Sequence, residues 1–503
     1  MKSQTRVLQK FARGAVVTAF LVLVGCGSNG SSNPATTIST GPYVPTGFNW
    51  KACDDSASTT SVQCSTLQVP FDYNNPSVGT FTLYVKLLPA ANPTLRIGSM
   101  MVNPGGPGFG GSSLADDASY YFSTDITDHF DIIAWDPRGT GKSTPAVDCV
   151  DDYDEYFGID SPPDSPEEKQ ALIDASQAFN DECMANSGEI LPYISTQASA
   201  TDMNSIRQAL GEDKISYFGF SYGSELGATW ATMFPQTVRA AVFDGAVDPQ
   251  ATSSQEGMAQ AGGFEGQLTT FLATCSKNNA CAFYNGGKAE AAFDSLLLAL
   301  DAKPLVVSAD RTPVTQGVAF TAVSQAMYSD SYWSQLEQAL ADAQQGDGSG
   351  LLKLYDDYYQ RQEDGSYGNE LEAFLAISCL DDPGSTSIKE VEDAVPDFVA
   401  AAPRLGANFG YGYSCALWPV EPAIKIDVTG KGAGPIVVIG TTGDPATPLA
   451  STRKMAAALE QGVLLIVEAN QHTGYGANEC INTAVDSYLI DLTVPVSETT
   501  CKS

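Results

Sequence analysis

The fold class is decided by the stretch Ile215-Ser-Tyr-Phe-Gly-Phe-Ser-Tyr-Gly223, an apolar run that passes into a GxSxG sequence. The segment from Ser224 to Phe234 that follows has helical character, so the serine lies on a turn between a strand and a helix. A Cβ atom on either flanking glycine would collide with the strand or the helix, and the turn exposes the hydroxyl of Ser221. A helix amino end beside the hydroxyl favours developing negative charge. The stretch therefore predicts a serine nucleophile at the end of a buried strand.

Other apolar runs resemble the strand before Ser221, and each leads into Gly, Asp or Asn at its end. They do not alternate with polar residues, and helical segments separate them, which is typical of parallel strands buried on both faces of an α/β sheet. Ligands of such sheets bind beyond the carboxyl ends of the strands. The runs are Ser99–Asn103, Phe130–Trp135, Ala240–Phe243, Pro435–Ile439 and Val463–Val467.

Between Pro249 and about Val428 strand-like runs are scarce, and apolar residues follow helical spacing. Phe293, Leu296 and Leu300 show this spacing together with Leu297. We interpret residues 250–428 as a mainly helical domain inserted into the sheet domain. The two parts of the sheet domain are then residues 47–249 and residues 429–503.

Residues 1–26 predict the signal peptide of a lipoprotein. Four basic residues precede the apolar run Gly14 to Val24, which is too short to span a bilayer. The sequence Leu23-Val-Gly-Cys26 is similar to the lipobox of bacterial lipoproteins, in which the cysteine carries the lipid. An ordinary signal peptide with an incidental cysteine is the alternative. Residues 27–46 are rich in Ser, Gly, Asn, Thr and Pro, which predicts a flexible tether. We expect an exported protein that a lipid on Cys26 attaches to the cell envelope, on the periplasmic or extracellular face.

The charge balance excludes one class of partner. The chain has 26 Lys and Arg against 59 Asp and Glu, a formal net charge of −33. Such a charge repels phosphate backbones, which excludes a general nucleic-acid binder, and it disfavours docking on anionic lipid. We interpret the acidity as keeping an exported protein soluble.

The cysteines indicate an oxidising compartment. Eleven cysteines minus Cys26 leave ten, an even number that falls into neighbouring couples. Sequence alone does not fix the connectivity, but five local disulfides are our interpretation. Without a CxxC sequence or paired histidines, and with two histidines in the chain, we expect neither a metal site nor a cofactor. The expected pairs are Cys53–Cys64, Cys149–Cys183, Cys275–Cys281, Cys379–Cys415 and Cys480–Cys501.

A serine nucleophile needs a base, and the chain offers His129 and His472. His129 precedes a strand and has the character of a surface loop residue, whereas His472 follows the last strand-like run. Chain order then requires an acid between Ser221 and His472, at the end of a strand. Asp444 has this position and would orient the imidazole. Two other carboxylates nearby lie outside the strand-end position: Asp427 and Glu468.

The transition state of acyl transfer also needs donors for an oxyanion. The loop Pro104-Gly-Gly-Pro-Gly108 follows an early strand, and its glycines would let bare backbone approach a substrate. We predict the backbone amides of Gly106 and Tyr222 as the two donors. A merely flexible turn is the alternative interpretation of the loop.

Taken together, these segments resemble the α/β-hydrolase peptidases of the tripeptidyl and prolyl aminopeptidase family, over about Phe48 to Cys501. The resemblance implies an α/β-hydrolase fold with a mostly parallel central sheet and an inserted, mainly helical cap. It also implies Ser221 as nucleophile, Asp444 as triad acid and His472 as base. Further segments that carry the resemblance are Val69-Pro-Phe-Asp-Tyr73, Trp135-Asp-Pro-Arg-Gly139, Gly141-Lys-Ser-Thr-Pro145, Asp244-Gly-Ala-Val-Asp-Pro249, Ala376-Ile-Ser-Cys379, Trp418-Pro419, Gly443-Asp-Pro-Ala-Thr-Pro448 and His472-Thr-Gly-Tyr475.

The family implies cleavage of short peptides from the free amino end, so carboxylates must hold the substrate ammonium. Candidates for this role are Glu225, Asp248, Asp381 and Asp382. We interpret Asp136 and Arg138 as a structural ion pair that shapes the site. A carboxylesterase with the same triad, and a non-catalytic binding lipoprotein of the same fold, are the alternative functions.

Overall fold

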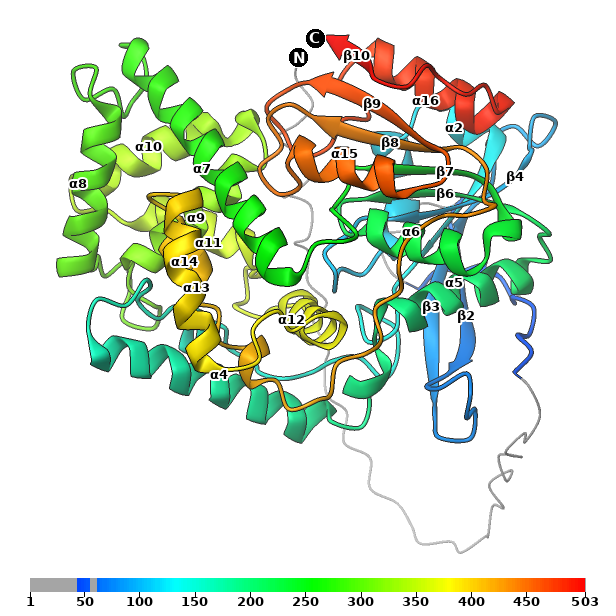
Figure 1. The fold of residues 1–503 in the computed structure, drawn as a ribbon, viewed down its shortest axis with the longest axis horizontal. Coiled ribbons are helices and arrows are strands. Elements are labelled where there is room, and N and C mark those ends of the chain that lie inside the picture. Colours follow the sequence, from blue (N-terminus) through cyan, green and yellow to red (C-terminus); the bar gives the residue numbers. More distant parts are fainter. Residues whose placement is uncertain (1–42, 55–60, 503) are drawn as a thin grey trace, which may run out of the picture.

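A computed structural model of the chain describes residues 43–54 and 61–502 (Figure 1). The predicted signal peptide, residue Cys26 and residues 27–42 of the predicted tether lie outside the described residues. Among the helices of the described part, none is long and apolar enough to cross a bilayer.

The described strands form a single ten-stranded sheet (Figure 1). Across the sheet the strands are β1 (Lys51–Ala52), β2 (Gln63–Pro70), β3 (Thr80–Leu88), β5 (Phe130–Trp135), β4 (Gly98–Asn103), β6 (Ile215–Phe220), β7 (Val238–Asp244), β8 (Ile436–Thr441), β9 (Gly462–Glu468) and β10 (Thr499–Lys502). In this order, neighbouring strands from β1 to β5 are antiparallel, and neighbouring strands from β5 to β10 are parallel.

The six predicted strands are the consecutive parallel strands β5, β4, β6, β7, β8 and β9, which confirms the α/β class. Every residue of β4, β6 and β8 is buried, because helices cover both faces of the sheet. The carboxyl ends of the parallel strands lie at one edge of the sheet. There β6 leads into the Ser221 turn, β8 leads to Asp444, and β9 leads to His472. The parallel part of the sheet thus brings the predicted site residues to one edge.

Helices pack on both faces of the sheet (Figure 1). One face carries α5 (Thr196–Leu210), α6 (Gly223–Met233) and α15 (Leu449–Ala458), whose apolar residues join Met101 of β4 in a common core. The other face carries α1 (Ala118–Tyr121), α2 (Thr124–His129) and α16 (Glu479–Asp491), which pack with Met100 and Val102 of the same strand. Along the chain, the helices α3 (Asp154–Phe157) and α4 (Pro166–Ser187) come between β5 and α5.

The segment between β7 and β8 is helical, and most of its helices lie beside the sheet rather than on its faces (Figure 1). These helices have a hydrophobic core of their own, which includes the predicted stripe Phe293, Leu296, Leu297 and Leu300 of α8. The helices are α7 (Ser253–Lys277), α8 (Ala289–Ala302), α9 (Gln316–Met327), α10 (Trp333–Ala343), α11 (Ser349–Tyr358), α12 (Glu370–Asp381), α13 (Ile388–Ala401) and α14 (Gly406–Gly410).

Helix α12 differs from the other helices of this segment. Its residues Ala373, Ala376, Ile377 and Leu380 pack into the core of the sheet domain, and none of them belongs to the core of the other inserted helices. Its first turn also lies against the predicted oxyanion loop, since a Cβ on Gly108 would be 2.4 Å from Glu370 O. The helix therefore connects the inserted segment to the loop beside the site.

The structure joins the ten described cysteines in the five expected pairs. Cys379–Cys415 closes a loop of 36 residues and fastens the end of α12, whereas Cys275–Cys281 closes a loop of 6 residues. Loop-closure entropy in the unfolded chain grows with loop length. We expect double alanine replacement of the first pair to lower the free energy of unfolding by about 4 kcal/mol, and of the second pair by about 2 kcal/mol. Urea unfolding of the two variants checks the order; a larger loss for the shorter loop would contradict it.

The predicted ion pair between Asp136 and Arg138 is wrong. Arg138 is fully buried and binds the carboxylate of Asp202 on α5, with Nη2 2.6 Å from Oδ1 and Nε 2.7 Å from Oδ2. Asp136 instead accepts hydrogen bonds from the amides of Ser112 and Lys142, at 2.8 Å each. Asp136 and Arg138 lie in the turn that follows β5, two positions apart, and their side chains contact different partners.

Candidate active site

Ser221 lies on a sharp turn between β6 and α6, as the sequence predicts. Its φ is +55°, a left-handed value that costs a non-glycine residue strain and is held by the surrounding structure. A Cβ on Gly219 would be 2.3 Å from Gly223 O, and one on Gly223 would be 2.9 Å from Asn103 Oδ1. Close packing therefore requires glycine at both positions. Because they have no side chains, the turn can lie directly against the neighbouring backbone and Asn103.

Asp444 and His472 come together at the carboxyl ends of β8 and β9. The distance from His472 Nδ1 to Asp444 Oδ1 is 2.8 Å, and the Asp444 side chain is completely buried. This hydrogen bond fixes the orientation of the imidazole and leaves Nε2 as the ring nitrogen that can take up a proton. Glu468 pairs with Lys502 on the exposed edge of the sheet, and Asp427 is exposed, so neither competes with Asp444.

The carboxylate of Asp444 is held by the residues that follow it. Oδ1 accepts hydrogen bonds from the amides of Ala446 and Thr447, and Oδ2 accepts one of 2.9 Å from the hydroxyl of Thr447. The same hydroxyl lies 3.4 Å from His472 Nδ1. Sequence reasoning missed Thr447 as a site residue. Thr447 could have been found from its position three residues after Asp444. A turn at that spacing brings the amide and the hydroxyl of a threonine back to the carboxylate of the aspartate.

The predicted oxyanion loop lies directly against the Ser221 turn. A Cβ on Gly105 would be 2.8 Å from Ser221 Cβ and 3.2 Å from Tyr222 N, so a side chain is excluded there. Within the described residues, the amides of Gly106 and Tyr222 donate no hydrogen bond. Two unengaged N–H groups beside a serine hydroxyl form the arrangement that can stabilise an oxyanion.

Ser221 and His472 are linked through Asp244, the last residue of β7. The amide of Ser221 donates to the carbonyl of Asp244 at 2.8 Å, and a Cβ on the next residue, Gly245, would be 3.2 Å from His472 Cε1. No hydrogen bond joins the Ser221 hydroxyl to His472 within the part of the chain that the structure describes. Such contacts are often long without substrate and tighten in the complex.

His129 is distant from this edge of the sheet. It is the last residue of α2 rather than a loop residue, and its Nδ1 lies 2.7 Å from the carbonyl of Asp125. Since β5 begins at the next residue, His129 lies at the amino ends of the parallel strands, opposite Ser221. His472 is therefore the histidine that the fold brings to the site.

Two of the predicted amine ligands bind the chain's own groups. Asp381 accepts hydrogen bonds from the amide and the hydroxyl of Thr196, at 3.0 and 2.5 Å, and burial raises its pKa to about 7. Asp382 accepts from the amides of Ser253 and Gly384. Their carboxylates serve as caps of neighbouring segments.

Glu225 keeps capacity for a ligand. It lies one helical turn after Ser221, its side chain is 25% exposed, and the nearest cation, Lys425 Nζ, is 3.8 Å away. The fourth candidate, Asp248, is paired with Lys454 Nζ at 2.7 Å. Of the carboxylates that the sequence singled out, Glu225 is the one with free hydrogen-bonding capacity beside the nucleophile.

Glu256, in the first turn of α7, is a carboxylate that sequence reasoning missed. Both of its carboxylate oxygens are shielded from solvent and have no hydrogen-bond partner among the described residues. Burial, together with the charges of Asp248 and Glu225, raises the pKa of Glu256 to about 7, against the lowering effect of the Asp248 backbone and of the charge of Lys425. Nothing in the helical spacing distinguishes it from a solvated glutamate, so only the folded chain reveals it.

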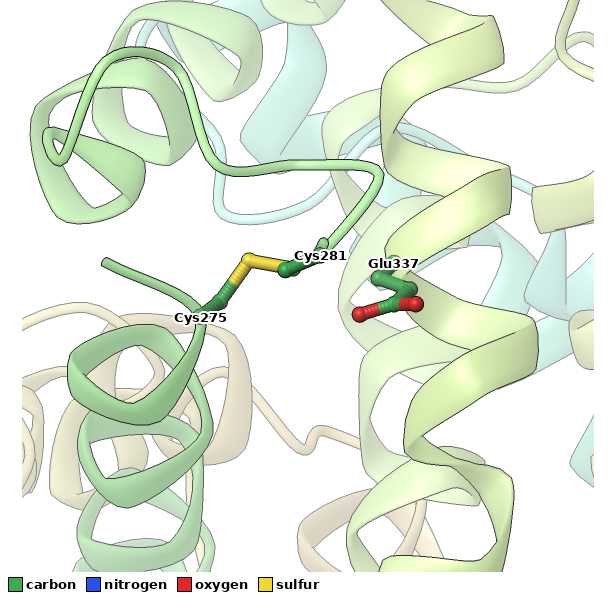
Figure 2. Close-up of side chains that lie close together, drawn as sticks. All are labelled: Cys275, Cys281 and Glu337. Carbon is green, nitrogen blue, oxygen red and sulfur yellow. A yellow bond between two sulfur atoms is a disulfide. The ribbon is translucent and has the colours of Figure 1, made fainter. Parts of the chain in front are cut away.

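One group of side chains in the described residues has the proximity of metal ligands: Cys275, Cys281 and Glu337 (Figure 2). Figure 2 shows the two sulfur atoms joined in a disulfide, with the Glu337 carboxylate across from it. Metal binding by cysteine requires thiolates, which a disulfide does not offer. This cluster is therefore a covalent link within the helical segment.

Comparisons with known proteins agree with this geometry. Residues 98–475 match the family of the alpha/beta hydrolase fold. The chain is 33% identical to Serine protease Hip1 of Mycobacterium tuberculosis, over 97% of this chain and 96% of that protein. It is 34% identical to Carboxylesterase B of the same species, over 92% and 91%. It is 29% identical to Tripeptidyl aminopeptidase of Streptomyces lividans, over 90% and 86%.

Among solved structures, the crystal structure of proline iminopeptidase from Mycobacterium smegmatis matches with a TM-score of 0.37 and 16% identity, over 85% of this chain and 99% of that one. The family match covers most of the chain, and the relatives above match nearly its whole length. The chain therefore belongs to the alpha/beta hydrolase fold family and is a hydrolase of that superfamily.

Proposed function

We propose that this protein is a serine exopeptidase that removes short peptides from the free amino end of its substrates. The observation that carries the proposal is the 2.8 Å hydrogen bond between His472 and the buried Asp444, at the same edge of the sheet as the strained Ser221 turn. The likeness to Tripeptidyl aminopeptidase and Serine protease Hip1 supports peptides as the substrate class.

In the proposed reaction His472 Nε2 takes the proton of the Ser221 hydroxyl while Oγ attacks the scissile carbonyl. The amides of Gly106 and Tyr222 stabilise the oxyanion of the tetrahedral intermediate. His472 then gives the proton to the leaving amine, and an acyl group remains on Ser221. Water, deprotonated by His472, releases the acid and restores the hydroxyl. Asp444 stabilises the imidazolium that forms in both halves of the reaction.

The pH dependence of the reaction follows from the surroundings of His472. Burial by itself lowers the pKa of the imidazole, but the charge and hydrogen bond of Asp444 and the charge of Asp244 more than offset it, so the pKa lies above its ordinary value of 6.5. The base must be neutral, so activity is lost as the pH falls through this raised pKa. We expect kcat/KM to rise with pH through a midpoint above 6.5. A pH–rate profile with a midpoint below that value would contradict the assignment.

Glu225 and Glu256 are the proposed ligands of the substrate ammonium. An ammonium group would supply the hydrogen-bond donors that both Glu256 oxygens lack, and it would offset the repulsion between the two carboxylates. Glu225 lies in the first turn of α6, the helix that follows the Ser221 turn. Asp381 and Asp382 are excluded from this proposal because the chain's own amides occupy their oxygens.

Three chromogenic substrates test the exopeptidase activity: a tripeptide amide with a free amino end, its N-acetylated form, and a short acyl ester. We expect acetylation to lower kcat/KM by roughly 10- to 100-fold, since hydrogen bonds to a charged group are worth about 1.5–3 kcal/mol. Glu256→Gln should remove most of this discrimination, and Glu479→Gln on the exposed surface of α16 should leave it intact. Equal rates with and without the acetyl group would rule out recognition of the amino end.

A carboxylesterase is the second candidate, because the chain is 34% identical to Carboxylesterase B. The same triad would serve both activities, so geometry alone does not separate them. Turnover of the acyl ester that is faster than turnover of the free peptide by orders of magnitude would establish the esterase as the main activity.

We further propose that the protein is exported and held at the cell envelope by a lipid on Cys26, without other contact with the membrane or with nucleic acid. The lipobox-like Leu23-Val-Gly-Cys26 and the basic leader support this proposal. A Cys26→Ser variant is expected to move from the membrane fraction to the soluble fraction. Recovery of both forms in the same fraction would contradict the anchor.

A further inference from the structure

Asp244 has two attachments to the candidate site, one through its backbone and one through its side chain. It ends β7, beside Phe220 of β6, and its side chain is completely buried. Its carbonyl oxygen accepts the amide of Ser221 at 2.8 Å. Its carboxylate accepts the amides of Gly474 and Tyr475, with Oδ1 and Oδ2 at 2.8 Å each. One residue therefore holds the nucleophile turn and the segment after His472.

The segment around His472 is fixed on both sides. Its amide donates to the carbonyl of Tyr328 at 3.0 Å, and the hydroxyl of Thr441 binds the carbonyl of Gln471. On the other side, the two bonds to Asp244 begin only two residues after His472. Loss of the Asp244 bonds would leave the backbone around His472 anchored on one side only.

We propose that Asp244 is a positioning residue of the proposed hydrolase, which sets the distance between the Ser221 hydroxyl and the His472 imidazole. The proposal rests on the proposed function. Asp244 acts through its bonds to the two segments and does not touch the substrate. It does not replace Asp444 as triad acid, because both of its oxygens bind backbone amides and His472 Nδ1 binds Asp444.

The carboxylate also has an electrostatic effect on the base. No described lysine or arginine pairs with Asp244, and the titratable groups that face it are His472 and Asp444. Burial raises the pKa of Asp244 to about 6, against the lowering effect of the two amides, so it is ionised at neutral pH. Its negative charge raises the pKa of His472, together with that of Asp444; the ring of Tyr328 lies across the imidazole at 5.6 Å.

Asp244→Asn tests the proposal. An asparagine of the same shape offers one acceptor oxygen, and its NH2 group would face an N–H donor, so one of the two segment bonds is lost. We expect kcat to fall by about 10- to 100-fold, the scale on which small misplacements of reacting groups slow catalysis. We expect KM to stay within about twofold and the acid midpoint of kcat/KM to move to lower pH.

Asp131→Asn is the matched control. Asp131 lies near the amino end of β5, away from Ser221, with its side chain 17% exposed, and it accepts hydrogen bonds from the amide of Ala90 at 2.9 Å and from Arg96 Nε at 2.8 Å. Its loss should lower the melting temperature in a similar way but leave kcat and the acid midpoint unchanged. Wild-type kcat and an unmoved midpoint in Asp244→Asn would overturn the positioning role. A wild-type protein that neither hydrolyses peptides or esters nor reacts at Ser221 would instead overturn the proposed function.

A measurement on the wild-type protein applies even if Asp244→Asn does not fold. The logarithm of the rate of Ser221 labelling by a fluorophosphonate should fall with a slope of about one below the pKa of His472. Below about pH 6, where Asp244 also takes up a proton, the rate should fall below this line by about a further 10- to 100-fold, the loss expected for Asp244→Asn. A slope of one throughout, in protein that remains folded by circular dichroism, would overturn the proposal.

Discussion

Replacing Ser221 with alanine is expected to lower kcat for both peptide and ester substrates by roughly 10⁶-fold, the scale of loss seen when a triad nucleophile is removed. The remaining groups can still bind substrate and stabilise an oxyanion, but no acyl-enzyme can form. The fold should persist, because alanine is no larger than serine and the hydroxyl of Ser221 makes no hydrogen bond within the described residues. The melting temperature should change by about 2 °C or less.

Ser224→Ala is the control for this variant. Ser224 lies in the first turn of α6, is completely buried and accepts a hydrogen bond from the amide of Val247 at 3.2 Å. Its loss should cost about 1 kcal/mol of stability and leave turnover intact. Measurable turnover by purified Ser221→Ala above a level of about one part in 10⁴ would show that another residue is the nucleophile.

Asp444→Asn is expected to lower kcat by about 10⁴-fold with little change in KM. Oδ1 of Asp444 accepts the amides of Ala446 and Thr447 and also lies 2.8 Å from His472 Nδ1, so the asparagine keeps the turn when its carbonyl oxygen takes the Oδ1 position. Its NH2 group then replaces Oδ2 beside the Thr447 hydroxyl, and the imidazolium that forms in the reaction loses its counter-charge. In the opposite orientation the NH2 group would face His472 Nδ1 and favour the tautomer with the proton on Nε2, which cannot take the proton of Ser221.

Steady-state kinetics across pH on Asp444→Asn check this expectation, with Asp427→Asn as the control. Asp427 is an exposed aspartate on the segment that leads to β8, and its replacement should leave kcat within about twofold. A loss of less than about tenfold in Asp444→Asn would show that the 2.8 Å bond to His472 is not needed for catalysis.

Much of the parallel sheet is predictable because its strands are buried on both faces. Every residue of β4, β6 and β8 is buried and most of them are apolar, so these strands are distinguishable from the helices around them. The topology then places Ser221, Asp444 and His472 at one edge, because all three follow carboxyl ends of parallel strands. Chain order together with a position after the end of a strand distinguishes Asp444 from other acids without knowledge of distances.

The antiparallel strands were not predictable in the same way. Buried and partly exposed residues alternate along much of β3, and only three of the eight residues of β2 are buried, so neither forms a continuous apolar run. β10 is four residues long at the edge of the sheet and is held by Cys480–Cys501. Short edge strands depend on tertiary contacts that no local pattern records.

The partners of buried charged residues also could not be predicted from the sequence. Arg138 binds Asp202, 64 residues along the chain, and not Asp136 two residues before it. In the same way, the isolation of Glu256 and the double attachment of Asp244 result from the meeting of distant segments. Spacing identifies residues that lie on one element, but it does not show which charges from different elements face each other.

Mapping the residue modified by a fluorophosphonate, by mass spectrometry of the wild-type protein, is the most direct test of a Ser221 nucleophile activated by His472. We expect one adduct per chain, on the peptide that contains Ser221, and no adduct in His472→Ala under the same conditions. An adduct on a different serine, or no adduct on protein that hydrolyses its substrate, would contradict the proposed mechanism.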